Sequence, residues 1–246
     1  MEKEEPVLRR NSMNKWPKKL PPLTREEEEV RDKFIKLWHE VLPQKYGVVE
    51  KFNHHYPLLS KRSKGERVIE IGAGIGAHLS YEEPDWAKYV CVELRPEMAA
   101  VIKGSYPNVE VIIGDCQKEL PVEDHSFDRA LAIHVLEHLP NLPAALDEIG
   151  RVLKPKGLLS VCIPCEAGFA YNLARQISAK RVFKKYFPGL DYDQLIVAHE
   201  HINGPEEIFH ELAIRFEIIH KRYFPILLPS INLNLVIGII LRPHLK

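Results

Sequence analysis

Hydrophobic residues along the chain gather in short runs that alternate with stretches of helical periodicity. The runs are rich in Val and Ile, which is typical of strands buried on both faces of a parallel sheet. Strands alternating with helices predict an α/β fold. The expected strands are residues 68–71, 89–93, 109–113, 129–133, 158–163, 215–223 and 232–241.

Three glycines, Gly72, Gly74 and Gly76, directly follow the first expected strand. Glycine lets the backbone turn tightly there and lets a ligand approach closely. The pattern is ambiguous, because Ala77 completes the dinucleotide fingerprint G-x-G-x-x-A while Gly76 completes G-x-G-x-G. The choice between NAD and another nucleotide-type cofactor therefore depends on residues further along the chain.

Acidic residues follow the second and third expected strands. Glu93 ends the second strand, roughly 20 residues after the glycines, where a carboxylate would hold a ribose diol. Asp115 follows the third strand and is placed to accept a hydrogen bond from an adenine amino group. A site lined by Glu70, Glu93 and Asp115 also suits a cation such as a sulfonium.

These motifs belong to an ordered set that covers about 100 residues. The set resembles the class I S-adenosylmethionine (SAM) dependent methyltransferases, particularly the type that includes the ubiquinone and menaquinone biosynthesis enzymes. The resemblance implies a Rossmann-like three-layer α/β sandwich with a seven-stranded mixed sheet whose last strand is antiparallel. The motifs that carry it are Glu70-x-Gly72-x-Gly74-x-Gly76, Glu93, Gly114-Asp115, Phe127-Asp128, Leu136-Glu137-His138 and Leu153-x-Pro155-x-Gly157.

The resemblance also implies a site for SAM, which leaves as S-adenosylhomocysteine. It assigns the glycine loop to the methionine and ribose side of the cofactor and Glu93 to the ribose hydroxyls. Asp115 with Cys116 is assigned to the adenine, and His134 to the neighbourhood of the sulfonium. The full expected cofactor set is Glu70, Gly72, Ala73, Gly74, Gly76, Glu93, Leu94, Asp115, Cys116 and His134.

Histidines supply the candidates for a general base. His134 follows the fourth expected strand, and His199 and His201 lie after the fifth, on the rim where open α/β sheets bind ligands. These three histidines are the catalytic candidates. The candidate acceptor-binding residues are His54, Tyr56 and Tyr171.

The chain divides by composition into an arm, a cap and a catalytic domain. Proline-rich, aperiodic sequence over residues 1–22 predicts a flexible arm. Thr24 and Glu27 form a capping box that opens a helix with an apolar stripe. We expect a helical cap over residues 23–60 and a methyltransferase domain over residues 61–246, with an insertion at about 165–203.

Residues 175–185 form a basic amphipathic stretch without an acidic residue. This pattern predicts either a solvated helix over the pocket or surface contact with an anionic acceptor or a membrane. The chain as a whole has 246 residues, 45% hydrophobic content and a formal net charge of zero, so charge provides no general attraction to nucleic acid. We therefore expect no nucleic-acid partner; no sequence signal indicates an oligomeric state.

The most apolar segment, residues 226–241, is interrupted by Pro229, Asn232 and Asn234. It is too short and too polar to span a bilayer, so we expect no transmembrane segment. The amino-terminal residues contain no apolar signal segment, and we expect a cytoplasmic protein.

Two spacings resemble metal motifs. Residues 134–138 match H-x-x-E-H, but that motif requires both histidines on one helix, whereas here it straddles the end of a strand. Cys162 and Cys165 match C-x-x-C, but no second pair of cysteines completes a zinc site. We expect no metal.

The sequence therefore predicts transfer of the SAM methyl group to an oxygen, nitrogen or carbon atom of a small-molecule, sugar or lipid-linked acceptor. Two alternatives remain open. An NAD-dependent oxidoreductase would share the glycine loop and Glu93, but it leaves Gly114 and Asp115 unexplained. A SAM-binding protein without methyl transfer would keep every cofactor motif.

Overall fold

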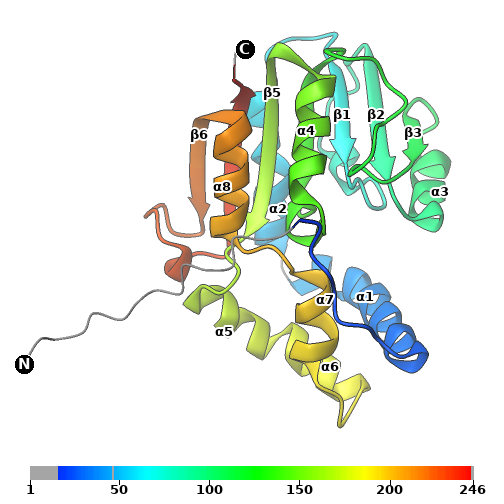
Figure 1. The fold of residues 1–246 in the computed structure, drawn as a ribbon, viewed down its shortest axis with the longest axis vertical. Helices are drawn as coiled ribbons and strands as arrows, with labels where there is room; N and C mark the ends of the chain where they lie inside the picture. The colour runs from blue at the N-terminus through cyan, green and yellow to red at the C-terminus, as the bar shows by residue number, and fades with distance from the viewer. Residues whose placement is uncertain (1–15, 46, 245–246) are drawn as a thin grey trace, which may run out of the picture.

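The computed structural model describes residues 16–45 and 47–244 and contains a seven-stranded sheet with helices on both faces (Figure 1). The strand order is β3-β2-β1-β4-β5-β7-β6. The strands are β1 (Arg67–Ile71), β2 (Lys88–Glu93), β3 (Glu110–Ile113), β4 (Phe127–Ile133), β5 (Leu153–Pro164), β6 (Phe216–Phe224) and β7 (Val236–Pro243).

Only the last strand runs against the others. Strands β1 to β5 pair in parallel, β7 pairs antiparallel with β5 in the register Val161↔Ile239, and β6 pairs antiparallel with β7. The first three strands follow one another toward one edge of the sheet, and β4 then lies on the other side of β1. At such a change in strand order, open α/β sheets form a ligand crevice at the carboxyl ends of the strands. The predicted seven-stranded mixed sheet is confirmed.

Two boundaries differ from the sequence prediction. The fifth strand was expected from residue 158 but begins at Leu153, because Pro155 offers no amide hydrogen with which the preceding helix could continue. The last strand was expected from residue 232 but begins at Val236. The side chain of Asn234 accounts for this shift, since it folds the preceding residues into a compact turn by accepting from Ile226 N at 2.7 Å and donating to Ser230 O at 2.9 Å.

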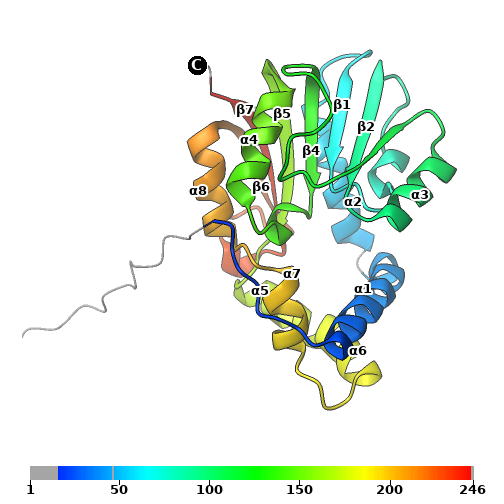
Figure 2. The same ribbon diagram turned by 45° about the vertical axis from the view of Figure 1, so that its right-hand side comes forward.

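Two layers of helices cover the sheet. One face packs against α4 and α8, and the other packs against α2 and α3 (Figures 1 and 2). The helices are α1 (Arg25–Lys45), α2 (Gly47–His55), α3 (Pro96–Ser105), α4 (Leu142–Val152), α5 (Phe169–Ile177), α6 (Ala179–Tyr186), α7 (Ala198–Glu200) and α8 (Pro205–Arg215). Single turns or short segments are η1 (Pro57–Ser60), η2 (Ala77–Ser80), η3 (Leu136–His138), the π-helical η4 (Asp193–Val197) and η5 (Ile231–Leu233).

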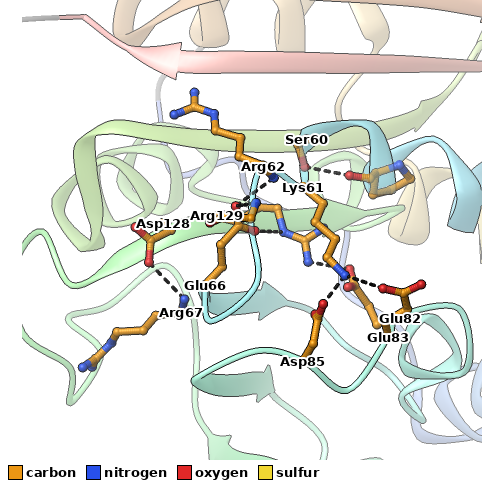
Figure 3. A network of polar contacts seen from close by, with 12 residues as sticks. Ser60, Lys61, Arg62, Glu66, Arg67, Glu82, Glu83, Asp85, Asp128 and Arg129 are labelled. Atoms are coloured by element: carbon orange, nitrogen blue, oxygen red, sulfur yellow. Dashed lines mark hydrogen bonds and ion pairs between the residues drawn. The ribbon is translucent and has the colours of Figure 1, made fainter.

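After the glycine loop the chain forms only the single 3-10 turn η2. Pro84 breaks helical periodicity just beyond it. A buried polar network holds this segment to the sheet (Figure 3): Glu82 accepts from Arg129 at 2.7 Å and lies 3.0 Å from His78, and Arg129 Nε lies 3.4 Å from Glu66. Glu82 and Arg129 are almost fully buried, so their opposite charges compensate each other in a low-dielectric interior.

A helical lobe lies beyond the carboxyl ends of the strands (Figures 1 and 2). It combines α1 with α6, η4 and α7, which come from the predicted cap and the predicted insertion respectively. Its core is aromatic, with the Phe34 ring packed edge-on against both Phe183 and Tyr192. We refer to α1 together with residues 165–203 as the helical lobe.

Part of the predicted flexible arm is held in place. Residues 1–15 lie outside the described residues, but Trp16 packs against the main core. Lys18 N donates to Pro140 O at 2.8 Å, and Lys18 Nζ contacts Glu207 and Ile202 O, each at 2.8 Å. The expectation of flexibility is therefore corrected for residues 16–22, because this ion pair and the backbone hydrogen bonds tie them to the domain.

All four cysteines are buried and free. Burial raises the pKa of the Cys165 thiol to about 12, so its thiolate is scarce at neutral pH. No helix in residues 16–45 and 47–244 has the length and apolar character needed to cross a bilayer.

Candidate active site

The glycine loop after β1 adopts left-handed backbone conformations. Gly72, Gly74 and Gly76 have φ values of 66°, 58° and 80°, a region that favours glycine. A Cβ on Gly72 would lie 2.5 Å from the side chain of Val135, so the loop packs directly on the residues that follow β4. A Cβ on Gly74 would meet nothing within 4 Å, so the loop faces open space on its other side.

Glu93, at the end of β2, fixes the shape of this loop. Its two carboxylate oxygens accept from Gly74 N at 2.8 Å and from Arg95 N at 2.9 Å. Each carboxylate oxygen has capacity for a second hydrogen bond, which a ribose hydroxyl could supply. The next side chain, Leu94, is 62% exposed and offers an apolar surface beside the carboxylate.

Asp115 is held at the end of β3 by Gln117. Its Oδ1 accepts from Gln117 N at 3.0 Å and from Gln117 Nε2 at 2.9 Å, and Gln117 Oε1 in turn accepts from Asn141 N at 2.6 Å. The adjacent Cys116 is buried, and burial together with the charge of Asp115 raises the pKa of its thiol to about 12. Cys116 is therefore suited to packing rather than to nucleophilic chemistry.

These features fit SAM. The open space beside Gly74 allows close approach of a ligand, and Glu93 and Asp115 keep free acceptor capacity where a nucleoside presents its hydroxyls and amino group. The neighbouring carboxylates suit a sulfonium cation better than they suit the phosphates of a dinucleotide.

Glu70 does not reach this edge of the sheet. It lies inside β1, only 3% exposed, and accepts a hydrogen bond from the Tyr89 hydroxyl at 2.7 Å. Burial raises the pKa of its carboxyl group. The structure thus places Glu70 in the interior, where Tyr89 uses one of its two carboxylate oxygens; its expected role in cofactor binding stays a prediction.

His134 follows β4 with a strained φ of 50°. Its Nδ1 lies 3.1 Å from Glu137 Oε1; because a carboxylate only accepts, Nδ1 carries the proton. Its Nε2 is buried without a hydrogen-bond partner among the described residues. His134 precedes Val135, which touches the glycine loop, so an imidazole with a free Nε2 lies beside the cofactor side of the crevice.

Glu137 is the electrostatic centre of the site. It is 1% exposed; although burial raises its pKa, the hydrogen bond from His134 and the charges of His138 and His201 lower it to about 2. Burial lowers the pKa of His134, but the hydrogen bond to Glu137 and the charges of Glu137 and Glu50 outweigh this effect and raise it. The pKa of His138 is instead lowered by burial and by His201.

His201 comes from the helical lobe and faces the same cluster. Its ring lies 5.2 Å from the ring of His138, and its Nδ1 lies 2.9 Å from Glu166 Oε2. Glu166 also pairs with Arg175, whose guanidinium lies 5.0 Å from the ring centre of Tyr171. Tyr171 and His201, both predicted to lie near the acceptor, are therefore brought together on one wall of the site.

His199 has a different environment from that of His201. Its Nδ1 lies 3.0 Å from Gln194 O and its Nε2 lies 3.0 Å from Pro21 O. Both ring nitrogens thus face backbone carbonyls, which only accept hydrogen bonds. Neither ring nitrogen is therefore directed at a substrate. The expected role of His199 as a base is corrected: the ring instead joins the lobe to the amino-terminal segment.

The two acceptor candidates of the predicted cap are packed against the domain. Tyr56 is 3% exposed, covers Gly238 of β7, and its hydroxyl lies 2.9 Å from His220 Nδ1. Burial raises the pKa of its hydroxyl group. Its expected role in acceptor binding is corrected to one in the core. His54 is also buried, stacks on Tyr81 at 4.8 Å and lies 3.4 Å from Glu50.

Sequence reasoning missed three acidic residues that shape the site: Glu50, Glu137 and Glu166. The sequence showed Glu137 as part of a motif, but its hydrogen bond with His134 depends on the turn between the two residues. Glu50 lies in α2 and Glu166 lies in the turn between β5 and α5, with no motif around either residue, so no local signal marked them. Within residues 16–45 and 47–244, no group of three or more His, Cys, Asp or Glu side chains is arranged to hold a metal ion.

The sheet with one reversed strand and the glycine loop facing Glu93 define the class of nucleoside-binding α/β proteins. Within that class, residues 69–161 match the family model described as a methyltransferase domain. Residues 69–161 therefore carry a methyltransferase domain of the class I SAM-dependent type. This match decides between the two cofactors that the glycine pattern left open, in favour of SAM.

Two curated relatives are similar over part of their length. The sterol 4-C-methyltransferase strm-1 of Caenorhabditis elegans is 35% identical over 42% of this chain and 33% of its own. The demethylmenaquinone methyltransferase of Chlorobaculum tepidum is 29% identical over 52% of this chain and 51% of its own. The chain thus spans about a third of one relative and about half of the other.

Two solved structures share the fold. The PH0226 protein from Pyrococcus horikoshii OT3 is 19% identical with a TM-score of 0.59, covering 84% of this chain and 98% of that one. The SpnF cyclase is 16% identical with the same TM-score of 0.59, covering 80% of this chain and 82% of that one. Since one neighbour is a cyclase, the fold by itself does not fix the reaction.

Proposed function

We propose that this protein transfers the methyl group of SAM to a lipid or lipid-linked acceptor, with His134 as the general base. The observation that carries the proposal is the pairing of His134 with buried Glu137, which leaves Nε2 free beside the cofactor loop. The names of the two relatives, which act on a sterol and on demethylmenaquinone, support an apolar acceptor.

Methyl transfer from SAM requires the chain mainly to position the acceptor and to accept its proton. When bound, SAM supplies an activated methyl group that an acceptor atom takes by in-line displacement. The chain must hold the acceptor in line and exclude water, and both effects lower the barrier. His134 Nε2 takes the proton that an acceptor hydroxyl, amine or acidic carbon loses, while Glu137 holds the ring and stabilises the resulting imidazolium.

The helical lobe supplies the opposite wall in this proposal. His201 and Tyr171 would contact the acceptor, and Glu166 with Arg175 would hold them in place. Phenol, imidazole and apolar neighbours together suit an amphipathic acceptor with one polar group. The division into arm, cap and methyltransferase domain remains part of this proposal.

The test is transfer of label from methyl-labelled SAM into a cell extract that is then separated into organic, small polar and polymer fractions. We expect label in the organic fraction with the intact protein and none with a Glu93→Ala, Asp115→Ala double variant. The matched control is Asp124→Ala, which removes an exposed carboxylate away from the cofactor loop.

Other outcomes of this experiment would favour the alternatives to the proposal. Label in the polymer fraction would indicate a nucleic-acid or protein acceptor, against our expectation that the protein has no nucleic-acid partner. SAM binding without any labelled product would favour a SAM-binding protein without methyl transfer. Failure to bind SAM would refute the cofactor assignment itself.

We also propose a cytoplasmic location. Four buried thiols without a disulfide suit a reducing compartment. Fractionation of cells followed by detection of the protein tests this location, and recovery from an oxidising extracellular compartment would contradict it.

A further inference from the structure

Helix α5 carries an apolar stripe that faces solvent. None of its residues is buried, and Phe169, Leu173 and Ile177 are 70%, 51% and 67% exposed. Their spacing of four residues places them on one face of the helix. Large apolar side chains exposed together, rather than singly, mark interaction surfaces.

A second exposed apolar segment lies directly beside α5. The connection between β6 and β7 exposes Leu227 and Leu228 to 68% and 60%, with Ile226 and Leu233 also exposed. Its turn η5 packs against α5, where Phe169 N donates to Asn232 Oδ1 at 3.3 Å (Figure 1). We call α5 and residues 226–233 together the α5–loop surface.

The backbone of this connection is satisfied from within the protein. Asn234, which is fully buried, accepts from Ile226 N at 2.7 Å and donates to Leu228 O at 3.0 Å and Ser230 O at 2.9 Å. A loop tip can enter an apolar medium only when its polar backbone groups have partners. The two leucines are therefore presented on a turn whose polar groups are largely satisfied.

Basic residues lie on α6, which follows α5 in the chain and packs against it. From Phe169 through Tyr186 the chain has five basic residues and no acidic one. Lys180 and Arg175 are paired with acids of the lobe, while Lys184 and Lys185 lie in the last turn of α6. Apolar side chains beside lysines are the combination by which interfacial helices bind anionic bilayers.

We propose that the α5–loop surface docks on an anionic lipid bilayer, with Phe169, Leu173, Ile177, Leu227 and Leu228 entering the interface and the α6 lysines meeting the headgroups. A second copy of this chain fits less well. A twofold dimer would set the same surface against itself and bring like charges together. The inference concerns the partner of a surface outside the catalytic cluster, and it does not depend on methyl transfer.

The experiment is flotation of the full chain with vesicles of phosphatidylcholine mixed with phosphatidylglycerol, and with vesicles of phosphatidylcholine alone, without SAM or acceptor. We expect binding to the anionic vesicles that weakens as salt is raised. A Leu173→Asp, Leu227→Asp variant should bind roughly tenfold more weakly or worse. A Lys184→Ala, Lys185→Ala variant should lose about fivefold for each lysine, on anionic vesicles only.

The matched control is Ile214→Asp, which introduces the same charge at a 57% exposed apolar residue on α8, away from this surface. It should bind vesicles like the unmodified protein. SAM binding by calorimetry, measured for every variant, reports that the fold is intact. Absence of vesicle binding, or equal loss in all variants, would overturn the proposal. The proposal would also be overturned if light scattering showed a dimer that the Leu173→Asp variant dissociates, and if neither the dimer nor the variant bound vesicles.

Discussion

The cofactor side and the acceptor side of the crevice are built in different ways. On the cofactor side, Gly72, Gly74 and Glu93 come from consecutive strand–loop units and contact one another through backbone groups. On the acceptor side, Glu137 binds His134 and also interacts with the charge of His201, which pairs with Glu166. His201 and Glu166 belong to the part of the lobe that follows α1 by more than a hundred residues. One side is local in sequence, whereas the other is assembled from distant segments.

This difference explains why the same cofactor site can serve many acceptors. A glycine loop and a carboxylate at a strand end recognise SAM through groups that allow little variation. A lobe with its own aromatic core can change its lining without disturbing the sheet. The family-model match agrees with this division, because it covers residues 69–161, which include the glycine loop, Glu93 and Asp115 but exclude the helical lobe.

The largest expected effect is at His134, where the cofactor side of the crevice meets the acceptor side. His134→Gln should lower kcat by about 10²- to 10⁴-fold with SAM affinity unchanged, because the proposed base is lost. Since His134 acts as a base only when neutral and its pKa is raised, the unmodified rate should fall as pH drops through that raised pKa. The measurement is a pH–rate profile with the labelled fraction identified above.

Glu137→Gln separates positioning from proton transfer at the same junction. It should retain residual activity and move the acidic limb of the profile to lower pH, because the neutral amide no longer raises the pKa of His134. An unshifted profile would contradict the proposed pairing of these two residues.

The next effect concerns the network below the glycine loop. Glu82→Gln should lower the free energy of unfolding by about 4 kcal/mol at neutral pH, because buried Arg129 loses its shorter ion pair and keeps only the longer one with Glu66. The hydrogen bonds and charges of His78 and Arg129 outweigh burial and lower the pKa of Glu82 to about 2, from an ordinary value of 4.5. Its stabilising contribution is therefore present above pH 4.5 and lost as pH falls toward 2.

Urea unfolding at several pH values measures this contribution, and the variant should lack that part of the acid dependence. Glu83→Gln is the matched control, since its side chain is 78% exposed and its ion pair with Lys61 contributes little. Equal losses in the two variants would show that the buried network is not what holds this segment.

A smaller effect tests the loop itself. Gly72→Ala should lower the free energy of unfolding by about 3 kcal/mol and weaken SAM binding, because a Cβ meets Val135 and alanine disfavours a positive φ. Gly104→Ala, in α3 with open space around it, should instead be neutral or stabilise by about 0.5 kcal/mol. Thermal unfolding and calorimetry of SAM binding distinguish the two variants; similar behaviour would contradict the close packing.

The smallest effect is confined to the helical lobe. Thr24 N donates to Glu27 Oε2 at 2.7 Å and Glu27 N donates to Thr24 Oγ1 at 3.3 Å, which confirms the capping box. Thr24→Ala should destabilise the start of α1 by about 1 kcal/mol. Hydrogen exchange should quicken in α1 and leave β1–β3 and SAM binding unchanged. Faster exchange throughout the sheet would mean that the two sides of the crevice unfold together.

Prediction from the sequence succeeded where the signal was local. The apolar runs located all seven strands, and the glycines, Glu93 and Asp115 lie at the carboxyl ends of the strands as expected. It failed for Tyr56, because its apolar ring and hydroxyl suit a pocket as well as a core; only its packing on Gly238 decides between them. It did not show that Glu70 pairs with Tyr89, because that hydroxyl belongs to the neighbouring strand.

The sequence by itself therefore determined the sheet, the cofactor loop and the family, since each depends on periodicity or on a backbone conformation that few residues adopt. The tertiary structure alone decided which histidine has a free nitrogen. His134, His199 and His201 look alike in sequence, but Glu137, two backbone carbonyls and Glu166 respectively face their rings. Those partners come from across the fold, and an imidazole takes its protonation state and its role from the groups around it.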